Sequence, residues 1–127
     1  MLSATKKKYL FTIYELGNHG GSVRSVDIAR MLGGTKASVS NMLPSLIEKN
    51  MISKEDNGII SLTSDGAKYA SSLYLKYLTF YEFFSVKLGG SKENARKDAI
   101  ICLCSLIDEN TENITDYILK EMSDAAV

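Results

Sequence analysis

The first fifty residues carry hydrophobic side chains at the three-to-four-residue spacing of helices, with glycine pairs between the segments. The spacing predicts helices over residues 5–17, 26–32 and 35–50, the last of them capped by Thr35. The third helix is expected to bury a stripe made of Val39, Leu43, Leu46 and Ile47. Pro44 lies inside this helix, where it removes one N–H donor and predicts a kink that costs ~3 kcal/mol and has no function of its own.

The pattern then changes to that of a β-hairpin. Strands are predicted over residues 51–55 and 59–62, on either side of Asp56-Asn57-Gly58. Asn-Gly is the strongest short hairpin signal because both residues tolerate positive φ. No segment of the chain repeats another.

Helical spacing returns after the hairpin and continues towards the end of the chain. It predicts a long helix from Thr63-Ser64-Asp65-Gly66 to about Leu88, ended by Gly89-Gly90, and then helices over residues 92–107 and 111–122. The long helix carries one apolar stripe, composed of Leu73, Tyr77, Phe80, Phe84 and Leu88. The fold class is therefore expected to be mostly α, with three helices and a hairpin followed by three more helices.

The composition is that of an ordinary globular protein of one or two small domains. The 127 residues are 45% hydrophobic and 24% charged, and no apolar run approaches the ~20 residues of a membrane-spanning helix. No signal peptide is expected from Met1 to Lys8, and two cysteines spaced as CxC do not form a disulfide framework. These observations favour a cytoplasmic protein without a membrane partner.

Charge is distributed unevenly although it sums to zero. Residues 1–68 contain 9 basic and 6 acidic side chains, a balance of +3, and residues 69–127 contain 6 and 9, a balance of −3. Attraction for phosphate depends on local rather than total charge, so the first half permits a DNA partner. Two differently charged solvated faces would give the same split.

Two helices joined by a four-residue turn and followed by a hairpin are typical of a winged helix-turn-helix, which presents the start of its second helix to DNA. The candidate DNA-binding residues are Thr35, Lys36, Ala37, Ser38, Ser40 and Asn41 on that helix, with Lys54 and Asn57 on the hairpin. Asn41 is suited to pair with adenine, Ala37 to touch a thymine methyl group, and the hydroxyl side chains to bind phosphate. Helix capping alone would also select these hydroxyls, and similar winged domains serve as protein-interaction modules without DNA binding.

Four sequence motifs resemble the diphtheria-toxin-repressor family of iron- and manganese-dependent bacterial regulators, and they are Lys8–Leu16, Asp27–Ala29, Ser38–Leu43 and Leu62–Gly66. The resemblance implies a winged helix-turn-helix domain over residues 1–66 and a helical dimerisation domain over residues 67–127. It also implies a DNA-binding transcriptional regulator, in the first place a repressor, whose homodimer binds a pseudo-palindromic operator. The chain stops after the dimerisation helices, which is similar to the short manganese-regulator type.

Members of this family respond to Fe²⁺ or Mn²⁺, and the resemblance places their ligand positions on residues of different chemistry here. Those positions are Lys8, Phe11, Tyr77 (or Leu78), Ile101, Cys104 and Ser105, of which only Cys104 ligates strongly. No metal or other cofactor is therefore expected, although a different ligand set would leave the regulator metal-activated. Lys8 offers an ammonium group in place of the cation, or else belongs with Lys6 and Lys7 to a basic terminus beside phosphate.

No residue pattern points to an enzyme. The chain has one histidine, His19, expected in a solvated loop, and no glycine loop of the phosphate-binding type. Cys102 and Cys104 lie ~200° apart around their helix, so they neither chelate one ion together nor pair easily with each other. Their apolar neighbours indicate two small buried side chains.

Overall fold

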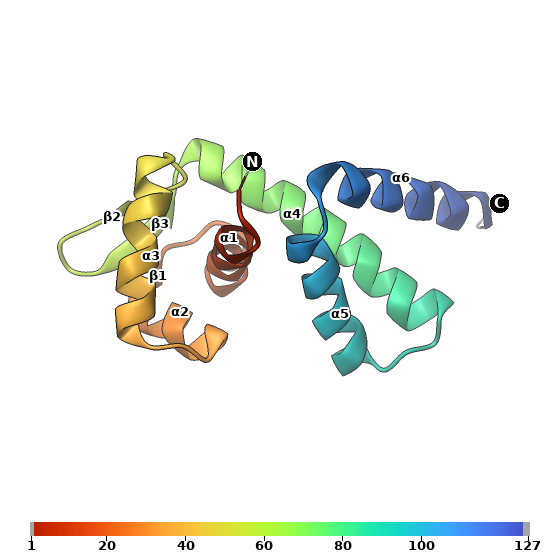
Figure 1. Cartoon of the computed structure of the whole chain (residues 1–127), viewed down its shortest axis with the longest axis horizontal. Coiled ribbons are helices and arrows are strands. Elements are labelled where there is room, and N and C mark those ends of the chain that lie inside the picture. Colours follow the sequence, from red (N-terminus) through yellow and green to blue (C-terminus); the bar gives the residue numbers. More distant parts are fainter. Residues whose placement is uncertain (1, 126–127) are drawn as a thin grey trace. The chain divides into compact units, whose positions relative to one another are not determined.

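The computed structural model describes residues 2–125 and is mostly helical with one small sheet, which confirms the mostly α fold class (Figure 1). Its elements in chain order are α1 (Ala4–Leu16), β1 (Val23–Arg24), α2 (Ser25–Leu32), α3 (Lys36–Glu48), β2 (Ile52–Lys54), β3 (Ile59–Leu62), α4 (Ser64–Glu82), the π-helix η1 (Phe83–Lys87), α5 (Lys92–Ser105) and α6 (Asp108–Ala125). None of the described helices has the length and apolar character needed to cross a bilayer.

The chain folds into two compact units that divide within α4. The N-terminal unit comprises Leu2 and residues 4–72, and the C-terminal unit comprises Ser3 and the residues from Leu73 onward. The beginning of α4 therefore belongs to the first unit and its remainder to the second.

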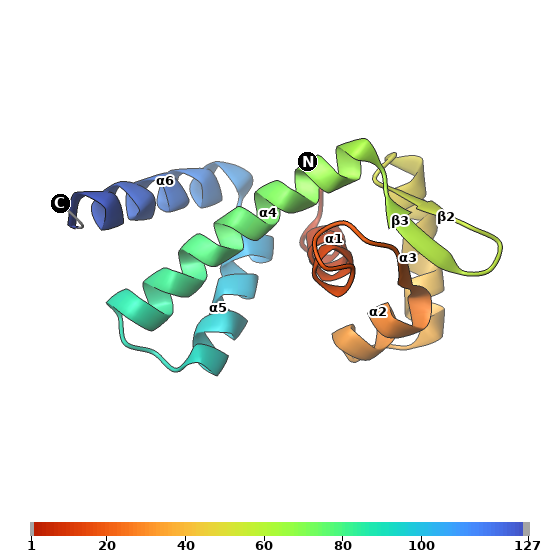
Figure 2. The same ribbon diagram turned by 180° about the vertical axis from the view of Figure 1, so that it is seen from behind.

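The N-terminal unit packs α1, α2 and α3 with a three-stranded antiparallel sheet in the order β1-β3-β2. Ile60 of the central strand pairs with Val23 on one side and with Lys54 on the other. In both views the β2–β3 hairpin extends beside α3 (Figures 1 and 2). The core combines side chains from the three helices and β3: Leu10, Phe11, Ile13, Ile28, Val39, Leu43, Leu46 and Ile60.

Several details of this unit differ from the sequence prediction. The sequence does not predict β1, because two residues show no alternation and the strand exists only through its pairing with β3. The connection from α2 to α3 is three residues long, Gly33 to Thr35, instead of four. Ile47 is 42% exposed and not part of the buried stripe, since it follows the buried Leu46 by ~100° around the helix. α3 continues through Pro44 as one helix.

The C-terminal unit contains the rest of α4, η1, α5 and α6 (Figure 2). Its buried apolar side chains come from all three α-helices: Leu73, Tyr77, Phe80, Ala95, Ala99, Leu103, Cys104 and Ile118. Small residues on α5 and large ones on α4 thus share one core. Leu73, Tyr77 and Phe80 confirm the first part of the apolar stripe predicted for the long helix, whereas Phe84 is only half-buried.

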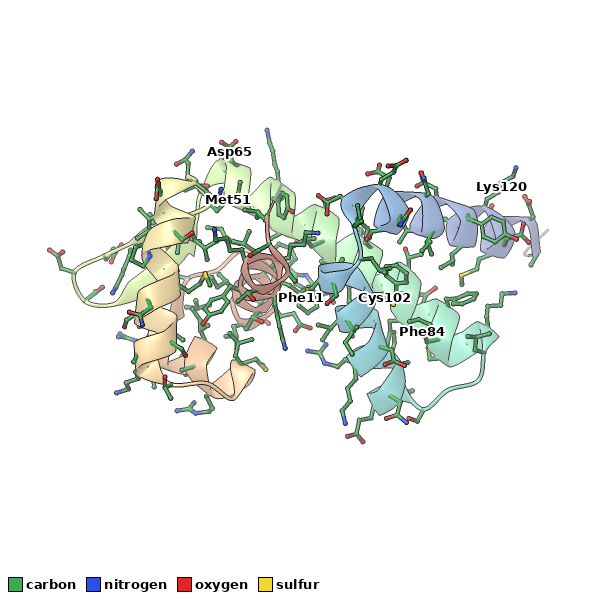
Figure 3. All side chains as sticks on the ribbon, viewed as in Figure 1. Phe11, Met51, Asp65, Phe84, Cys102 and Lys120 are labelled. Carbon is green, nitrogen blue, oxygen red and sulfur yellow. The ribbon has the colours of Figure 1, made fainter. Side chains whose placement is uncertain are left out.

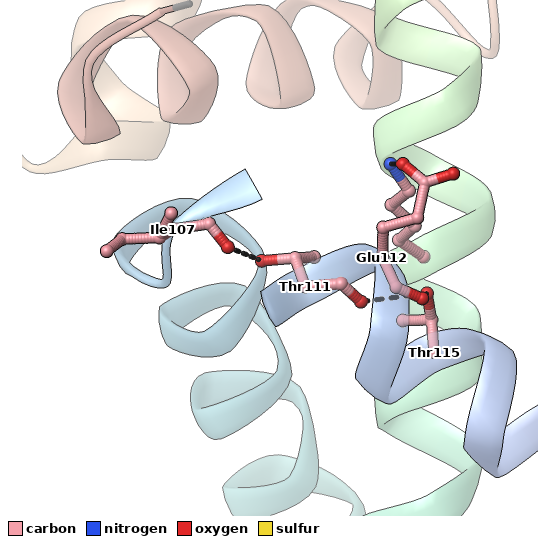
Figure 4. Close-up of polar contacts among 5 residues, drawn as sticks. Ile107, Thr111, Glu112 and Thr115 are labelled. Atoms are coloured by element: carbon pink, nitrogen blue, oxygen red, sulfur yellow. Dashed lines mark hydrogen bonds and ion pairs between the residues drawn. The ribbon is translucent and has the colours of Figure 1, made fainter. Parts of the chain in front are cut away.

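Two buried threonines of α6 donate their hydroxyl groups to backbone carbonyls one turn earlier in the chain (Figure 4). Thr111 donates to the carbonyl oxygen of Ile107 at 3.2 Å, and Thr115 donates to that of Thr111 at 2.9 Å. These bonds satisfy hydroxyls that would otherwise be costly to bury. An ion pair of 3.7 Å between Lys76 and Glu112 also joins α4 to α6.

The long helix ends in a different way from the prediction. Its α-helical part stops at Glu82, and the chain continues as η1, in which the N–H of Leu88 donates to the carbonyl oxygen of Phe83 at 3.0 Å. This five-residue spacing widens the last turn. Leu88 is 63% exposed, because the wider turn takes it out of register with the stripe that begins at Leu73. α6 begins at Asp108, earlier than the predicted residue 111.

Gly66→Ala is expected to lower the free energy of unfolding by more than ~2 kcal/mol, because a Cβ at Gly66 would run into the carbonyl oxygen of Met51 (labelled in Figure 3). Both groups are held in place: the N–H of Gly66 donates to Thr63 Oγ1 at 2.9 Å, and the N–H of Thr63 donates to the Met51 carbonyl at 3.0 Å. Urea unfolding followed by circular dichroism measures the loss. Ser72→Ala, at an exposed position of α4, is the control; equal stability of the two variants would contradict the close approach.

Candidate nucleic-acid interface

The start of α3 is fixed by a capping box made of Thr35 and Ser38. Thr35 Oγ1 accepts from the N–H of Ser38 at 3.0 Å, and Ser38 Oγ accepts from the N–H of Thr35 at 3.2 Å. The Ser38 hydroxyl also donates to the carbonyl oxygen of Thr35 at 2.8 Å. Two side chains predicted to bind phosphate are thus engaged in the cap, which orients the first turn and the N–H groups that point out of it.

One face of α3 lies outside the core. Val39 is 0% exposed and Leu43 is 1% exposed, so the helix turns its opposite side to solvent. That side carries the other candidates of this helix, all of them exposed: Lys36, Ala37, Ser40 and Asn41. Because these residues lie in the first two turns, their side chains and the positive end of the helix dipole are presented together.

The hairpin turn between β2 and β3 is stabilised by one of its own side chains. Asn57 Oδ1 accepts from the N–H of Ile59 at 3.2 Å, and Gly58 takes a φ of 83°. The N–H of Glu55 donates to the carbonyl of Ile59 at 2.8 Å and closes the turn. The Asn57 oxygen is therefore used within the hairpin, while its amide nitrogen is a donor. Lys54 is exposed at the end of β2.

The hairpin, β1 and α3 border a shallow groove of about 200 Å³. The residues that line it are Arg24, Ser25, Val26, Lys36, Ser40, Asn57 and Gly58. Lys36, Ser40 and Asn57 were all named from the sequence, so the structure brings helix and hairpin candidates to one place. The remaining candidates are exposed but do not line the groove: Thr35, Ala37, Ser38, Asn41 and Lys54.

Arg24 is a site residue that the sequence pattern does not reveal. It is exposed, precedes α2 without a side-chain cap hydrogen bond, and pairs through its backbone with Ile59 of β3. The groove therefore holds two cations, Arg24 and Lys36, whereas the acidic Glu55 and Asp56 lie at the hairpin turn. Only the pairing of a two-residue strand brings Arg24 beside the hairpin, and hydrophobic periodicity carries no signal for it.

The positions on α1 that the resemblance assigns to metal ligands hold no ligand. Lys8 is exposed, and Phe11 (labelled in Figure 3) is part of the core of the N-terminal unit. The lysine that this helix buries is Lys7, which is 3% exposed. His19 is exposed as predicted, and its ring stacks on Tyr14 with the centroids 5.0 Å apart.

Of the corresponding positions on α5, Ile101 offers no ligand atom and Ser105 only a weak one, whereas Cys104 has the sulfur of a strong ligand. Ile101 and Ser105 are exposed, whereas Cys104 is buried as predicted. Cys102 (Figure 3) is only half-buried, and burial raises the pKa of its thiol, with a further contribution from Asp98. The raised pKa disfavours the thiolate that a metal requires. Within the described part of the chain, no three His, Cys, Asp or Glu side chains are grouped so that they could hold an ion.

Residues 1–68, just over half of the 127-residue chain, match the family model described as a domain of unknown function, DUF8462. The chain belongs to the DUF8462 family. The matched part of this DUF8462 protein contains all the elements from α1 to β3 and the first residues of α4. No curated protein matches its sequence.

Several solved structures share the fold of this DUF8462 protein. The manganese regulator SloR is 26% identical with a TM-score of 0.72, over 91% of this chain and 53% of SloR. IdeR of T. acidophilum is 25% identical with a TM-score of 0.79, over 97% of this chain and 56% of IdeR. The hypothetical protein SSo2273 from Sulfolobus solfataricus is 23% identical with a TM-score of 0.63, over 94% of this chain and 91% of SSo2273.

These neighbours confirm the resemblance to the diphtheria-toxin-repressor family of metal-dependent transcriptional regulators. The DUF8462 chain spans just over half the length of SloR and of IdeR. The likeness to SSo2273, which it matches over most of both chains, is a likeness of fold.

Thr35→Ala is expected to lower the unfolding free energy of the DUF8462 chain by about 1 kcal/mol, because it removes the oxygen that accepts from the N–H of Ser38. Ser40→Ala is the control on the exposed side of the same helix and should change stability by less than ~0.5 kcal/mol. Urea unfolding measures both variants. If the two variants lost the same stability, Thr35 would not be the cap.

Proposed function

We propose that the chain is a DNA-binding transcriptional regulator that acts as a homodimer and represses by occupying a pseudo-palindromic operator. Its DNA-binding element is the winged helix-turn-helix of the N-terminal unit, with α3 as the recognition helix and the β2–β3 hairpin as the wing. The observation that carries the proposal is the groove in which the polar start of α3 meets the hairpin between Arg24 and Lys36. The likeness to SloR, a manganese regulator, supports a regulator of this class.

The exposed residues divide into two kinds of DNA contact. Lys36, Ser40 and Arg24 border the groove and have the cationic and hydroxyl groups that bind phosphate. Asn41 and Ala37 share the exposed face of α3 and suit base edges, since an amide pairs bidentately with adenine and a methyl group contacts thymine. Two further phosphate contacts are expected from the wing: Lys54 and Asn57.

The apolar surface of the C-terminal unit supports the homodimer. Its helices and loops leave these large hydrophobic side chains more than half exposed: Leu75, Val86, Leu88, Ile101, Ile107, Tyr117 and Leu119. Two grooves of about 530 and 500 Å³ run between the α4–η1 segment and α6. Apolar surface of this extent marks an interface, and a second copy on a twofold axis would present two recognition helices to successive major grooves ~34 Å apart.

DNA binding is expected to depend on Arg24 and Lys36. Alanine at either position should weaken binding to the chain's own upstream DNA and to unrelated DNA alike, because phosphate contacts do not depend on sequence. The slope of log affinity against log salt should fall by about 1 for each chain bound. Fluorescence anisotropy of labelled duplexes over a range of salt concentrations measures the slope, and sedimentation should give two chains per duplex.

Arg30→Ala is the matched control for these two variants. Arg30 is an exposed arginine of the same unit that pairs with Asp27 at 3.2 Å and does not line the groove. Its loss should leave the salt slope unchanged. Two results would overturn the assignment of the groove: DNA affinity that does not change with salt concentration, or an Arg30→Ala variant that loses as much affinity as Arg24→Ala.

Asn41→Ala is expected to change sequence preference and not salt dependence. The variant should lose ~1–3 kcal/mol on the preferred site and discriminate less at one base pair of each half-site, while binding unrelated DNA as before. Competition with single-base variants of the site measures this loss. Glu48→Ala, at the exposed far end of α3, is the control; an unaltered base preference in Asn41→Ala would show that α3 is not the recognition helix.

A winged-helix protein-interaction module without DNA binding is the second candidate. It is favoured by a separate groove of about 380 Å³ in the N-terminal unit, lined by Leu16, Ser22, Val23, Asp27, Arg30 and Met31. Met31 is 52% exposed, which suits a protein partner better than a nucleic acid. The anisotropy experiment separates the two candidates, since such a module would show no salt-dependent DNA binding.

A further inference from the structure

The C-terminal unit contains a row of tyrosines on α4 with one buried member. Tyr74, Tyr77 and Tyr81 follow one another at three and four residues, so their rings share a face of the helix. Their ring centroids are 5.8 and 5.9 Å apart. Tyr77 is 5% exposed, whereas the other two are half-buried. A phenol hydroxyl buried to this extent needs a hydrogen-bond partner.

Arg96 of α5 is that partner. Its Nη1 donates to the hydroxyl oxygen of Tyr77 at 3.0 Å, and its guanidinium carbon lies 5.5 Å from the centre of the same ring. A charge-assisted hydrogen bond and a cation–ring attraction therefore act on one side chain. Because the two residues belong to different helices, the Tyr77–Arg96 clamp joins α4 to α5 within the C-terminal unit.

A divalent cation finds no comparable set of groups in this unit. The resemblance assigns a ligand position to Tyr77 or to Leu78; the Tyr77 side chain is bound to a cation of the protein itself, and Leu78 has no ligand atom. The guanidinium keeps its positive charge throughout the physiological pH range and repels a second cation. The described residues also include no group of three His, Cys, Asp or Glu side chains of the kind that holds a metal.

We infer that Arg96 takes the place of a bound metal ion: the Tyr77–Arg96 clamp holds α4 against α5, and the C-terminal unit needs no divalent cation to complete its fold. Arg96 is a positioning residue in this account, since it acts on α4 through Tyr77. A cation tethered to α5 does not dissociate, so the clamp does not respond to the concentration of metal. The inference concerns the helical unit alone and stands whether or not the N-terminal unit binds DNA.

The test is thermal unfolding of the full chain after purification through EDTA, alone and with added Mn²⁺ or, under anaerobic conditions, Fe²⁺. The unsubstituted chain is expected to keep its Tm within ~1 °C when either ion is added. Arg96→Ala should lower Tm by about 3–8 °C. Lys97→Ala is the matched control, because it removes a charge from the same helix that forms an exposed ion pair with Glu93; it should lower Tm by less than ~2 °C.

Two conservative variants separate the clamp from simple packing of the arginine chain. Arg96→Lys keeps the charge and Tyr77→Phe keeps the ring, so each should lower Tm by less than Arg96→Ala does. The double variant Arg96→Lys with Tyr77→Phe should lower Tm by less than the sum of the two single losses, because both variants weaken the same contact. Additive losses in this double variant would assign Arg96 a packing role only. These two variants also decide the matter if Arg96→Ala does not fold.

Two outcomes would overturn the inference. A rise of several degrees in the Tm of the unsubstituted chain with Mn²⁺ or Fe²⁺ would show that the fold holds a metal site. An Arg96→Ala variant as stable as Lys97→Ala would show that the clamp contributes nothing. Neither outcome depends on DNA, so failure here is distinct from failure of the anisotropy experiment.

Discussion

The turn at Gly33 determines where α3 begins, and the candidate site depends on that position. Gly33 adopts a φ of 67°, and the N–H groups of Gly33 and Gly34 donate to the last carbonyls of α2 at 3.3 and 3.0 Å. This closes α2 and delivers the chain to the Thr35–Ser38 capping box. A start displaced by one residue would rotate the helix by ~100°, which would take Val39 out of the core and turn polar side chains into it.

The groove requires a second constraint, which is the pairing of β1 with β3. α3 alone offers Lys36 and Ser40, and the hairpin alone offers Asn57. Arg24 joins them because its backbone pairs with Ile59, far away along the sequence. The positive character of the groove is therefore a tertiary property, made by a short strand whose energy comes from the sheet and not from its own two residues.

Sequence periodicity was sufficient for the elements whose information is local. The capped start of α3, the Asn57-Gly58 hairpin and the order of the helices each depend on neighbouring residues, and the structure agrees with them. Periodicity failed where distant contacts decide the outcome, as with Arg24, or where the helix changes its pitch, as at η1. The role of Thr35 could not be predicted from the sequence either. A hydroxyl that caps a helix and one that binds phosphate are the same residue type at the same position, so only the hydrogen bonds of the structure show that Thr35 is the cap.

The chemistry around Tyr77 bears on how a regulator of this fold is controlled. Control by a metal ion requires a site that is empty at one concentration and occupied at another, since the ion must exchange with solvent for its level to be sensed. A guanidinium carried on α5 is present at every concentration, so its contact with Tyr77 transmits no such signal. Exposed apolar side chains of the C-terminal unit, among them Leu75, Tyr117 and Leu119, line the grooves between the α4–η1 segment and α6. If a second copy covers these grooves, a regulatory ligand that binds there and the dimer partner compete for the same side chains. DNA binding would then be controlled through the fraction of chains that are dimeric.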